Sequence, residues 1–337
     1  MTSWMRREID EIPDAVARLL ATQARVIAPL AAAVRSRHPR FAIVCGRGSS
    51  GHAATFLRYL LGTQAGLIAA EASPSIVTVY GRTLALDGAV FFLLSQSGRS
   101  PDLVAMARAA RDAGAFTVAL VNDPDSPAAL ACEAVIPILA GHEQSVAATK
   151  TVVNTMVAAA LFVAHLTGDA RLHEGIAQLP ARLARAVTLD WQAWGAALAG
   201  ASVGYVLARG ASFAVAHEIA LKLAETASLP SLAYSTAEFW HGPRAALQPG
   251  MPVLALRQND ETAADTDDLV ARLTRDGLDI TSVGGPGGTL AWIGDDHPAC
   301  DAIAMLAAAY GAIEAAARTR GRDPDAPPGL TKVTETR

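Results

Sequence analysis

The sequence predicts an α/β fold in which parallel sheets are flanked by helices. Apolar runs of strand length, such as 41–45, 89–94 and 116–121, alternate with longer stretches of helical periodicity. This alternation is typical of parallel strands whose crossovers are helices. A length of 337 residues and a composition that is 51% hydrophobic but only 5% aromatic fit about two such domains.

The expected elements follow one another in a regular order. Apolar residues recur at helical spacing over 12–30, which predicts an amphipathic lead helix with Pro13 near its start and Pro29 near its end. Two charge-free runs, 151–168 and 191–208, approach membrane-spanning length, but polar residues or glycines interrupt them, so both indicate buried elements. The remaining expected elements are strands at 41–45, 75–80, 89–94, 116–121 and 135–139, and helices that begin at Gly51, Pro101 and Pro127.

The two halves share a pattern that predicts a duplicated α/β unit. Arg-Gly-Ser-Ser at 47–50 is echoed 162 residues later by Arg-Gly-Ala-Ser at 209–212, and the same offset carries Gln96 to Gln258. Asp102 and the three residues after it also match the four residues from Asp268. The alternative is chance similarity between Ala-rich segments. The predicted domains are 1–175, which contains the lead helix, and 176–337.

The segment 91–102, Phe-Phe-Leu-Leu-Ser-Gln-Ser-Gly-Arg-Ser-Pro-Asp, predicts a site for one small phosphate monoester. A buried strand leads into a loop where Gly98 permits close approach of a ligand, and Ser100 and Pro101 suit the start of a helix. The N–H groups at that helix start favour an anion. The alternative is a polar strand-to-helix turn. The second copy has Arg-Gln-Asn-Asp at 257–260, so we expect only the first copy to bind phosphate.

Candidate acid/base groups lie in the second half. Glu218, Lys222 and Glu225 have the spacing i, i+4, i+7 and share one helix face. An exposed ion-pair ladder is the alternative, but the intervening residues are all apolar, which favours a cleft or an interface. His241 stands between an aromatic residue and a Gly-Pro turn. It is either structural or an acid/base group, since the ordinary imidazole pKa lies near neutrality.

The composition excludes several function classes. A formal charge of −4 without a local basic cluster gives no field for nucleic acid. The charged N-terminus lacks the apolar core of a signal peptide, so we expect a cytoplasmic protein that does not interact with a membrane. Cys45, Cys132 and Cys300 are odd in number and widely spaced, which indicates buried thiols rather than disulfides or a metal cluster.

Four motifs in the same order resemble the double-SIS (sugar isomerase) family. They are Ser-Gln-Ser-Gly at 95–98, Glu-Gln-Ser-Val-Ala-Ala-Thr-Lys at 143–150, the helix 218–225, and Glu-Phe-Trp-His-Gly-Pro at 238–243. The segment 323–336 is similar to the family's C-terminal tail. The nearest resemblance is to SIS-type glucosamine-6-phosphate deaminases and to the isomerase half of glutamine:fructose-6-phosphate amidotransferase. It implies two tandem SIS domains, each a flavodoxin-like, doubly wound parallel sheet flanked by helices.

The resemblance also implies roles for individual residues. Glu225 would be the base that moves a proton between C2 and C1, next to Lys222. His241 would assist ring opening from the neighbouring subunit of a homodimer, and Lys332 would form an imine with the open-chain sugar; the alternative for Lys332 is a solvated tail residue. No metal or other cofactor is implied. The implied ligand-binding residues are Ser95, Gln96, Ser97 and Ser100 for the phosphate, and Gly46, Arg47, Gly48, Ser49, Val146 and Ala147 for the sugar hydroxyls.

Departures from the family pattern favour one reaction. The chain shows neither an N-terminal cysteine nor a glutaminase-length domain ahead of the first unit, so we expect no glutamine hydrolysis. Arg47-Gly48 and Ala148 resemble the deaminase branch, although Arg47 is alternatively a structural ion-pair partner. The leading hypothesis is therefore an amino-sugar phosphate deaminase that converts glucosamine 6-phosphate and water to fructose 6-phosphate and ammonia. The alternatives are a ketose/aldose phosphate isomerase of the tagatose or galactosamine 6-phosphate type and a non-catalytic sugar-phosphate sensor.

Overall fold

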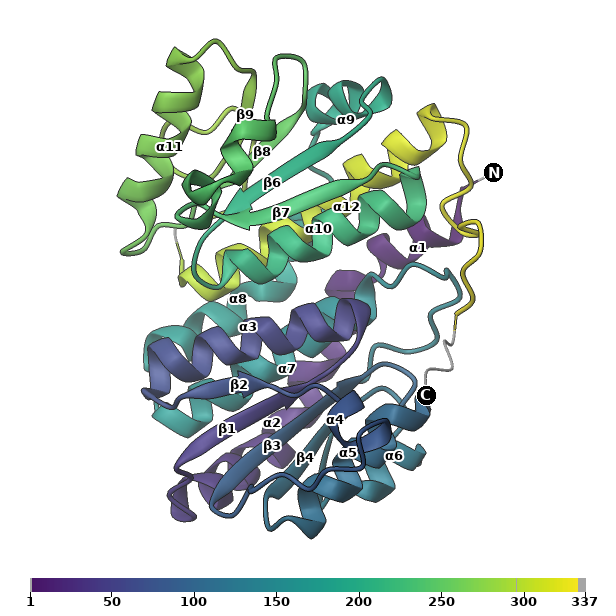
Figure 1. The fold of residues 1–337 in the computed structure, drawn as a ribbon, viewed down its shortest axis with the longest axis vertical. Coiled ribbons are helices and arrows are strands. Elements are labelled where there is room, and N and C mark those ends of the chain that lie inside the picture. The colour runs from purple at the N-terminus through teal and green to yellow at the C-terminus, as the bar shows by residue number, and fades with distance from the viewer. Residues whose placement is uncertain (1, 295, 333–337) are drawn as a thin grey trace. The chain divides into compact units, whose positions relative to one another are not determined.

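The computed structural model describes residues 2–294 and 296–332, which form two compact units (Figure 1). One contains residues 14–143 and 150–177 together with Thr331 and Lys332, and is called here the five-stranded unit. The other contains residues 2–13, 144–149 and 178–330, and is called the four-stranded unit. Each sheet with its helices is described separately below.

The five-stranded unit is built on a fully parallel sheet with the strand order β2-β1-β3-β4-β5. The strand bounds are β1 Phe41–Cys45, β2 Ala69–Glu71, β3 Ala89–Ser95, β4 Phe116–Val121 and β5 Ala134–Pro137. The helix bounds are α2 Ile12–Ser36, α3 Gly48–Ala65, α4 Ser75–Thr78, α5 Pro101–Asp112, α6 Pro127–Ala131, α7 Lys150–Thr167 and α8 Ala170–Ala186, of which α2 begins and α8 ends in the other unit.

Strand β3 explains why this sheet is covered on both faces. All seven of its residues are buried, and successive side chains point to opposite sides. Phe92 packs edge-on against Phe162 of α7, with 5.1 Å between ring centroids. Phe91 and Leu93 belong instead to a core cluster that includes Met106 of α5. The continuous apolar run at 91–94 therefore forms the centre of a sheet between two helix layers.

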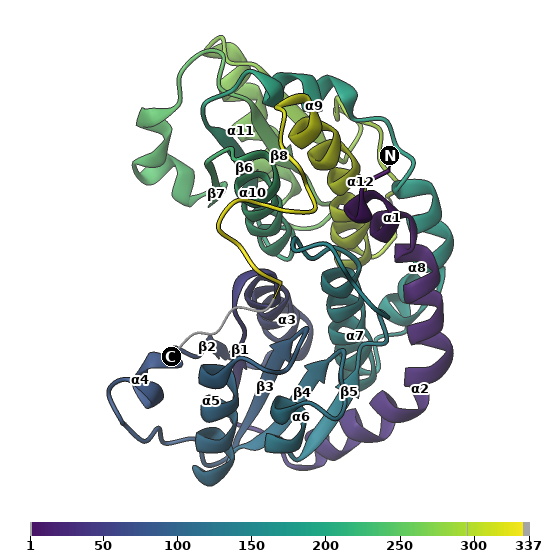
Figure 2. The same cartoon turned by 90° about the vertical axis from the view of Figure 1, so that its right-hand side faces the viewer.

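The four-stranded unit repeats this topology. Its parallel sheet has the order β7-β6-β8-β9, so β6, β7, β8 and β9 take the places of β1, β2, β3 and β4, as the duplication predicts. Helix α1 packs against α12 (Figure 2). The bounds are β6 Gly204–Ala208, β7 Ser231–Ser235, β8 Val253–Leu256, β9 Ile280–Val283, α1 Trp4–Asp10, α9 Gln192–Ala199, α10 Ser212–Ala227, η1 Glu238–His241, η2 Pro243–Ala246, α11 Ala263–Arg275 and α12 Pro298–Thr319.

Two described helices, α7 and α12, are long and apolar enough to cross a membrane by length and composition, and the two segments of α2 meet that test only when taken together. In the fold, 83% of the apolar window of α7 and 89% of that of α12 are buried. The prediction of buried elements is confirmed for both charge-free runs: 151–168 lies largely in α7, and 191–208 forms α9, a turn and β6.

Several expected elements differ from the structure. The run 75–80 is not a strand: Pro74 precedes a short helix, α4, and the neighbouring strand is β2, which the sequence analysis missed because Ala-Ala-Glu carries no β-branched residue. Pro29 lies inside α2, and a separate helix, α1, precedes it. The compact units also depart from the predicted domains 1–175 and 176–337, because 2–13 and 144–149 pack with the second sheet and Lys332 with the first unit.

Candidate functional site

The loop after β3 is shaped by its own serine hydroxyls. The Gly98 N–H donates to Ser95 Oγ at 3.1 Å, and the Arg99 N–H donates to Ser97 Oγ at 3.3 Å. Gly98 has φ +63°, and a Cβ at this position would lie 2.1 Å from Ser126 Oγ. The loop is therefore tightly turned against the start of α6, and only glycine fits at its apex.

The helix start predicted after this loop is present. Ser100 is the N-cap residue of α5 and Pro101 is its first residue, but the Ser100 hydroxyl makes no capping hydrogen bond. Asp102 lies in the first turn and its Oδ1 accepts the Leu103 N–H at 2.9 Å. The expectation that Ser100 caps the helix with its side chain is thus wrong, because Asp102 provides the acceptor in the first turn. The Ser100 hydroxyl remains available to a ligand at the helix N-terminus.

The turn 46–49 lies at the same edge of the sheet, because β1 and β3 are adjacent and parallel. Gly46 follows the last residue of β1, at a place where a Cβ would be 2.6 Å from the Ser50 carbonyl oxygen, and Gly48 begins α3 with φ +51°. The structure therefore brings the predicted phosphate-binding loop and the predicted 46–49 turn together within the five-stranded unit.

Arg47 forms an ion pair with Asp102. Its Nη2 and Nε lie 2.9 and 3.1 Å from Oδ2 of this carboxylate, which is 1% exposed, whereas Arg47 is half exposed. Arg209 also forms an ion pair in the four-stranded unit, through Nη1 to Asp265 Oδ2, although this carboxylate is 54% exposed. The partner is therefore not Asp268, which the sequence alignment matched to Asp102. Since the pair recurs in the copy that lacks the serine loop, it is a feature of the repeated scaffold. The structural alternative for Arg47 is confirmed; its contact with substrate stays a prediction.

The second copy uses the same region for internal bonds. Gln258 Oε1 accepts the Ser212 N–H at 3.0 Å at the start of α10, and Asp260 Oδ1 accepts the Thr262 N–H at 2.8 Å. A helix start whose N–H group is bonded to an amide side chain, next to a carboxylate, is a poor anion site. This geometry supports the prediction of a single phosphate-binding loop per chain.

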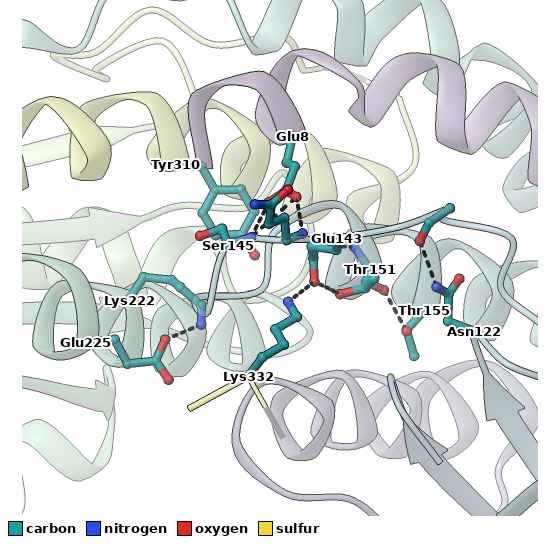
Figure 3. A network of polar contacts seen from close by, with 12 residues as sticks. Glu8, Asn122, Glu143, Ser145, Thr151, Thr155, Lys222, Glu225, Tyr310 and Lys332 are labelled. Carbon is teal, nitrogen blue, oxygen red and sulfur yellow. Dashed lines mark hydrogen bonds and ion pairs between the residues drawn. The ribbon is translucent and has the colours of Figure 1, made fainter. Parts of the chain in front are cut away.

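A buried carboxylate–lysine cluster lies on α10 (Figure 3). Lys222 Nζ forms a close ion pair with Glu225 Oε2 and lies 3.5 Å from Glu218 Oε1, and Tyr310 of α12 donates to that oxygen at 3.3 Å. Lys222 and Glu218 are 1% exposed, and the Glu225 side chain is 21% exposed. The alternative of an exposed ion-pair ladder is therefore wrong. Glu225 is the member of the cluster that a ligand can reach.

His241 does not join this cluster through any hydrogen bond. It ends the short helix η1, its side chain is exposed, and it has no hydrogen-bond or ion-pair partner within residues 2–294 and 296–332. The buried neighbour Phe239 anchors this helix to the core of the four-stranded unit. The structure thus presents His241 on the surface of its own chain.

Lys332 is held by a buried carboxylate. Its Nζ lies 2.9 Å from Glu143 Oε2, and Glu143 also accepts the N–H and the hydroxyl of Thr151 at the start of α7 (Figure 3). Lys332 is therefore not a solvated tail residue: its side chain is 25% exposed and ion-paired. Residues 333–336 of the predicted tail motif lie outside the described residues. The sequence analysis used Glu143 only as part of a motif and missed its contact with Lys332.

The loop 144–149, which contains Val146 and Ala147, is bound by a residue that the sequence analysis missed. Glu8 of α1 accepts the N–H groups of Gln144 and Ser145, and it is 3% exposed. A signal was present: Glu8 lies between Met5 and Ile9 on the buried stripe of its helix, where an unpaired carboxylate would be costly.

Comparison with known proteins gives the family. The SIS domain model matches residues 37–165 and 198–285, which is more than half of the chain. The chain belongs to the SIS domain family. The two matched segments contain β1 to β5 and β6 to β9, so each sheet is one SIS sheet, as the sequence predicts.

Relatives of this SIS protein have several names. A candidate phosphosugar isomerase from Silicibacter pomeroyi has a TM-score of 0.92 and 39% identity over 96% of this chain and 100% of its own. Glucosamine-6-phosphate deaminase from Thermotoga maritima, 19% identical, shares the fold with a TM-score of 0.82 over 99% of this chain and 100% of its own. The isomerizing glutamine–fructose-6-phosphate aminotransferase of Symbiobacterium thermophilum is 30% identical over 90% of this chain and 52% of its own sequence. The chain spans about half the length of that curated relative.

The predicted site residues of the SIS fold divide between the units. The serine loop, the 46–49 turn and Lys332 belong to the five-stranded unit, whereas Glu225, Lys222, His241 and the 146–147 backbone belong to the four-stranded unit. Among the described residues, no group of three or more His, Cys, Asp or Glu side chains is arranged to hold a metal ion.

Proposed function

We propose that this SIS protein is an enzyme that isomerises sugar phosphates and, as its specific reaction, converts glucosamine 6-phosphate and water to fructose 6-phosphate and ammonia. The observation that carries the proposal is the ion pair of the partly exposed Glu225 with the buried Lys222. A carboxylate that stays accessible while a buried ammonium fixes its position has the properties of a base for proton transfer between neighbouring carbons.

The reaction starts from the open-chain aldehyde with its amino group at C2. Glu225 takes the proton from C2, which gives an enaminol, and returns a proton to C1, which leaves a C=N bond at C2. Water adds to that carbon and ammonia leaves, so that the ketone of fructose 6-phosphate remains. Each step moves protons or water, and the balance requires no oxidant or reductant.

The serine loop serves a different end of the substrate. Ser95, at the end of β3, and Gln96, Ser97 and Ser100 in the loop after it lead into the start of α5, where the helix dipole favours a phosphate dianion. Because the phosphate does not react, its binding energy contributes to holding C1 and C2 in place. Lys332 takes part before this proton transfer, as the ring opens: it gives a proton to Glu143, and its neutral amine condenses with the C1 aldehyde to an imine and one water. Water then hydrolyses that imine, which returns the open-chain aldehyde and the free amine before Glu225 acts at C2.

Two further points belong to this proposal. His241, exposed on its own chain, assists ring opening in the site of a partner subunit of a homodimer, and the protein works in the cytoplasm. The name of the Thermotoga maritima neighbour supports deamination, whereas the name of the Escherichia coli neighbour, tagatose-6-phosphate ketose/aldose isomerase, supports isomerisation without loss of nitrogen.

Ammonia release separates these reactions. The purified chain is given glucosamine 6-phosphate, galactosamine 6-phosphate or N-acetylglucosamine 6-phosphate, and ammonia is measured with a coupled enzyme. Release from glucosamine 6-phosphate supports the proposal. Ketose/aldose exchange without ammonia from any amino sugar would assign the isomerase alternative, and binding without either reaction would assign a sensor.

The role of Glu225 is tested by Glu225→Gln. We expect loss of deuterium exchange at C2, by at least about a hundredfold for removal of a general base, with sugar-phosphate affinity retained. Glu261→Gln is the matched control, because Glu261 is an exposed carboxylate of the same unit outside the cluster. Unchanged exchange in Glu225→Gln would remove this residue from the base role.

A further inference from the structure

The strongest unexplained polar group outside the proposed reaction is Glu8. Its helix, α1, lies at the start of the chain, 136 residues before the loop that it contacts. The Glu8 carboxylate is 3% exposed and accepts two consecutive backbone N–H groups, with Ser145 N at 3.4 and 3.3 Å from its two oxygens and Gln144 N closer. A carboxylate that accepts backbone N–H groups forms charge-assisted bonds, about twice as strong as neutral ones.

Nothing about helix stability requires this arrangement. α1 is capped at its start by Ser3, which accepts the Arg6 N–H at 3.0 Å, and is anchored there by Asp325, which accepts the Trp4 and Met5 N–H groups at 2.7 and 2.8 Å. An apolar side chain at position 8 would suit the buried stripe of the helix better. The carboxylate therefore acts on the loop, which it contacts through the N–H groups of Gln144 and Ser145.

The loop that Glu8 holds is short and leads directly to Val146 and Ala147. Ala147 is 1% exposed, and the loop belongs to the four-stranded unit although the residues on both sides of it belong to the five-stranded unit. Only six residues, 144–149, form this loop, so Glu8 binds two of its six backbone amide groups. A loop without secondary structure keeps one conformation only where such bonds hold it.

We propose that Glu8 is a positioning residue that sets the affinity of the protein for the sugar part of its ligand by fixing the backbone at Val146 and Ala147. The inference rests on the proposed function, which assigns this backbone to the sugar hydroxyls. Glu8 does not touch the substrate. It acts through the N–H groups of Gln144 and Ser145, and so influences binding of a sugar phosphate but not of a bare phosphate.

The experiment compares Glu8→Ala and Glu8→Gln with Asp10→Asn, a control on the exposed side of the same helix, where Asp10 pairs with Arg6. Dissociation constants for fructose 6-phosphate and for inorganic phosphate are measured by calorimetry on the full chain. Amide hydrogen exchange reports on residues 144–149. If Glu8→Ala does not fold, Glu8→Gln decides alone, because its amide oxygen preserves one acceptor and the side-chain shape.

We expect Glu8→Ala to weaken fructose 6-phosphate binding about tenfold, the size of effect typical of groups that orient ligand-binding residues. Binding of inorganic phosphate should stay within twofold, amide exchange at 144–149 should accelerate, and KM should rise while kcat stays within twofold. Glu8→Gln should show the same pattern more weakly. Asp10→Asn should change nothing.

Equal weakening of both ligands, or faster exchange without any change in fructose 6-phosphate binding, would overturn the positioning role. These outcomes are separate from failure of the proposed function. Absence of ammonia release from the wild-type chain would refute the deaminase, while the ratio of the two dissociation constants would still decide the role of Glu8. A wild-type chain that binds phosphate but no sugar phosphate would refute both.

Discussion

The ammonium of Lys222 lies 3.5 Å from the carboxylate of Glu218, and both side chains are 1% exposed. Removal of one member of a buried ion pair leaves the other charge unpaired in the interior. We therefore expect Lys222→Met to lower the free energy of unfolding by about 3 kcal/mol. Urea unfolding followed by circular dichroism measures the change.

The double variant Glu218→Gln/Lys222→Met provides the control for this prediction. Because it removes both buried charges, it should recover part of the lost stability, which a double-mutant cycle reports as coupling. If the losses of Lys222→Met and of Glu218→Gln alone simply add up in the double variant, the pair contributes nothing as a pair.

Gly98→Ala should damage the phosphate-binding loop. The new methyl group would meet Ser126 Oγ at 2.1 Å and would also require a side chain at φ +63°. We expect a loss of about 2 kcal/mol in stability and weaker inhibition by inorganic phosphate. Gly66→Ala is a matched control, since Gly66 has φ +60° but no atom within 4 Å of its added Cβ. If both variants bind phosphate as the wild type does, the loop is not the phosphate site.

His165 should make the stability of the protein depend on pH. Burial, and secondarily the neighbouring His173 ring 4.4 Å away, lower the pKa of His165 below its ordinary value of 6.5. Between the lowered pKa and 6.5 the unfolded chain binds more protons than the folded one, so stability rises with pH across that window and falls on acidification. Urea midpoints at several pH values should show this slope.

The variant His165→Gln should abolish this dependence of stability on pH. His173→Gln should only reduce it, because the His173 ring is the smaller of the two causes that lower the pKa of His165. His142→Gln, at an exposed position, serves as the control. A slope that is identical in all three variants and the wild type would assign the pH dependence to other groups.

The three cysteines should be unreactive in the folded protein. Burial raises the pKa of Cys45 and of Cys132 to about 12, and raises that of Cys300 as well, so almost no thiolate forms at pH 8. Titration with a disulfide reagent should detect no thiol in buffer and all three in denaturant. Fast reaction of one thiol in buffer would show local opening around that residue.

Periodicity alone predicted most of the fold. Strand 41–45 and strand 116–121 have the predicted bounds, and Pro101 and Pro127 begin helices as expected, because long apolar runs and prolines act locally. The sequence analysis missed β2, because a strand of three residues shows no clear alternation. It took the residues of α4 for a strand, because a single helical turn shows no helical periodicity. The conformation of β2 is set by its pairing with β1 rather than by propensity.

The candidate site was predictable where chemistry and local sequence coincide. The serine loop is a contiguous motif, and the cluster of Lys222 lies on one helix face. The spacing of residues in the sequence was therefore enough to predict both. Glu8 and Glu143 were not assigned roles because their partners lie 136, 137 and 189 residues away, and contacts over such separations leave no periodic trace. The recurrence of an ion pair at Arg209, which decided the structural role of Arg47, also needed the three-dimensional comparison.

The path of the chain limits how this protein can be taken apart. Consecutive residues 143 and 144 belong to different compact units, and the backbone passes from one unit to the other five times, at 13/14, 143/144, 149/150, 177/178 and 330/331. A cut at the boundary between the repeats would leave one fragment carrying α1 and the 144–149 loop without the sheet they pack with. Although the sequence has the form of a tandem duplication, a fragment that contains only one repeat lacks segments of its own compact unit. Neither repeat can therefore be expressed or fused elsewhere as a complete unit.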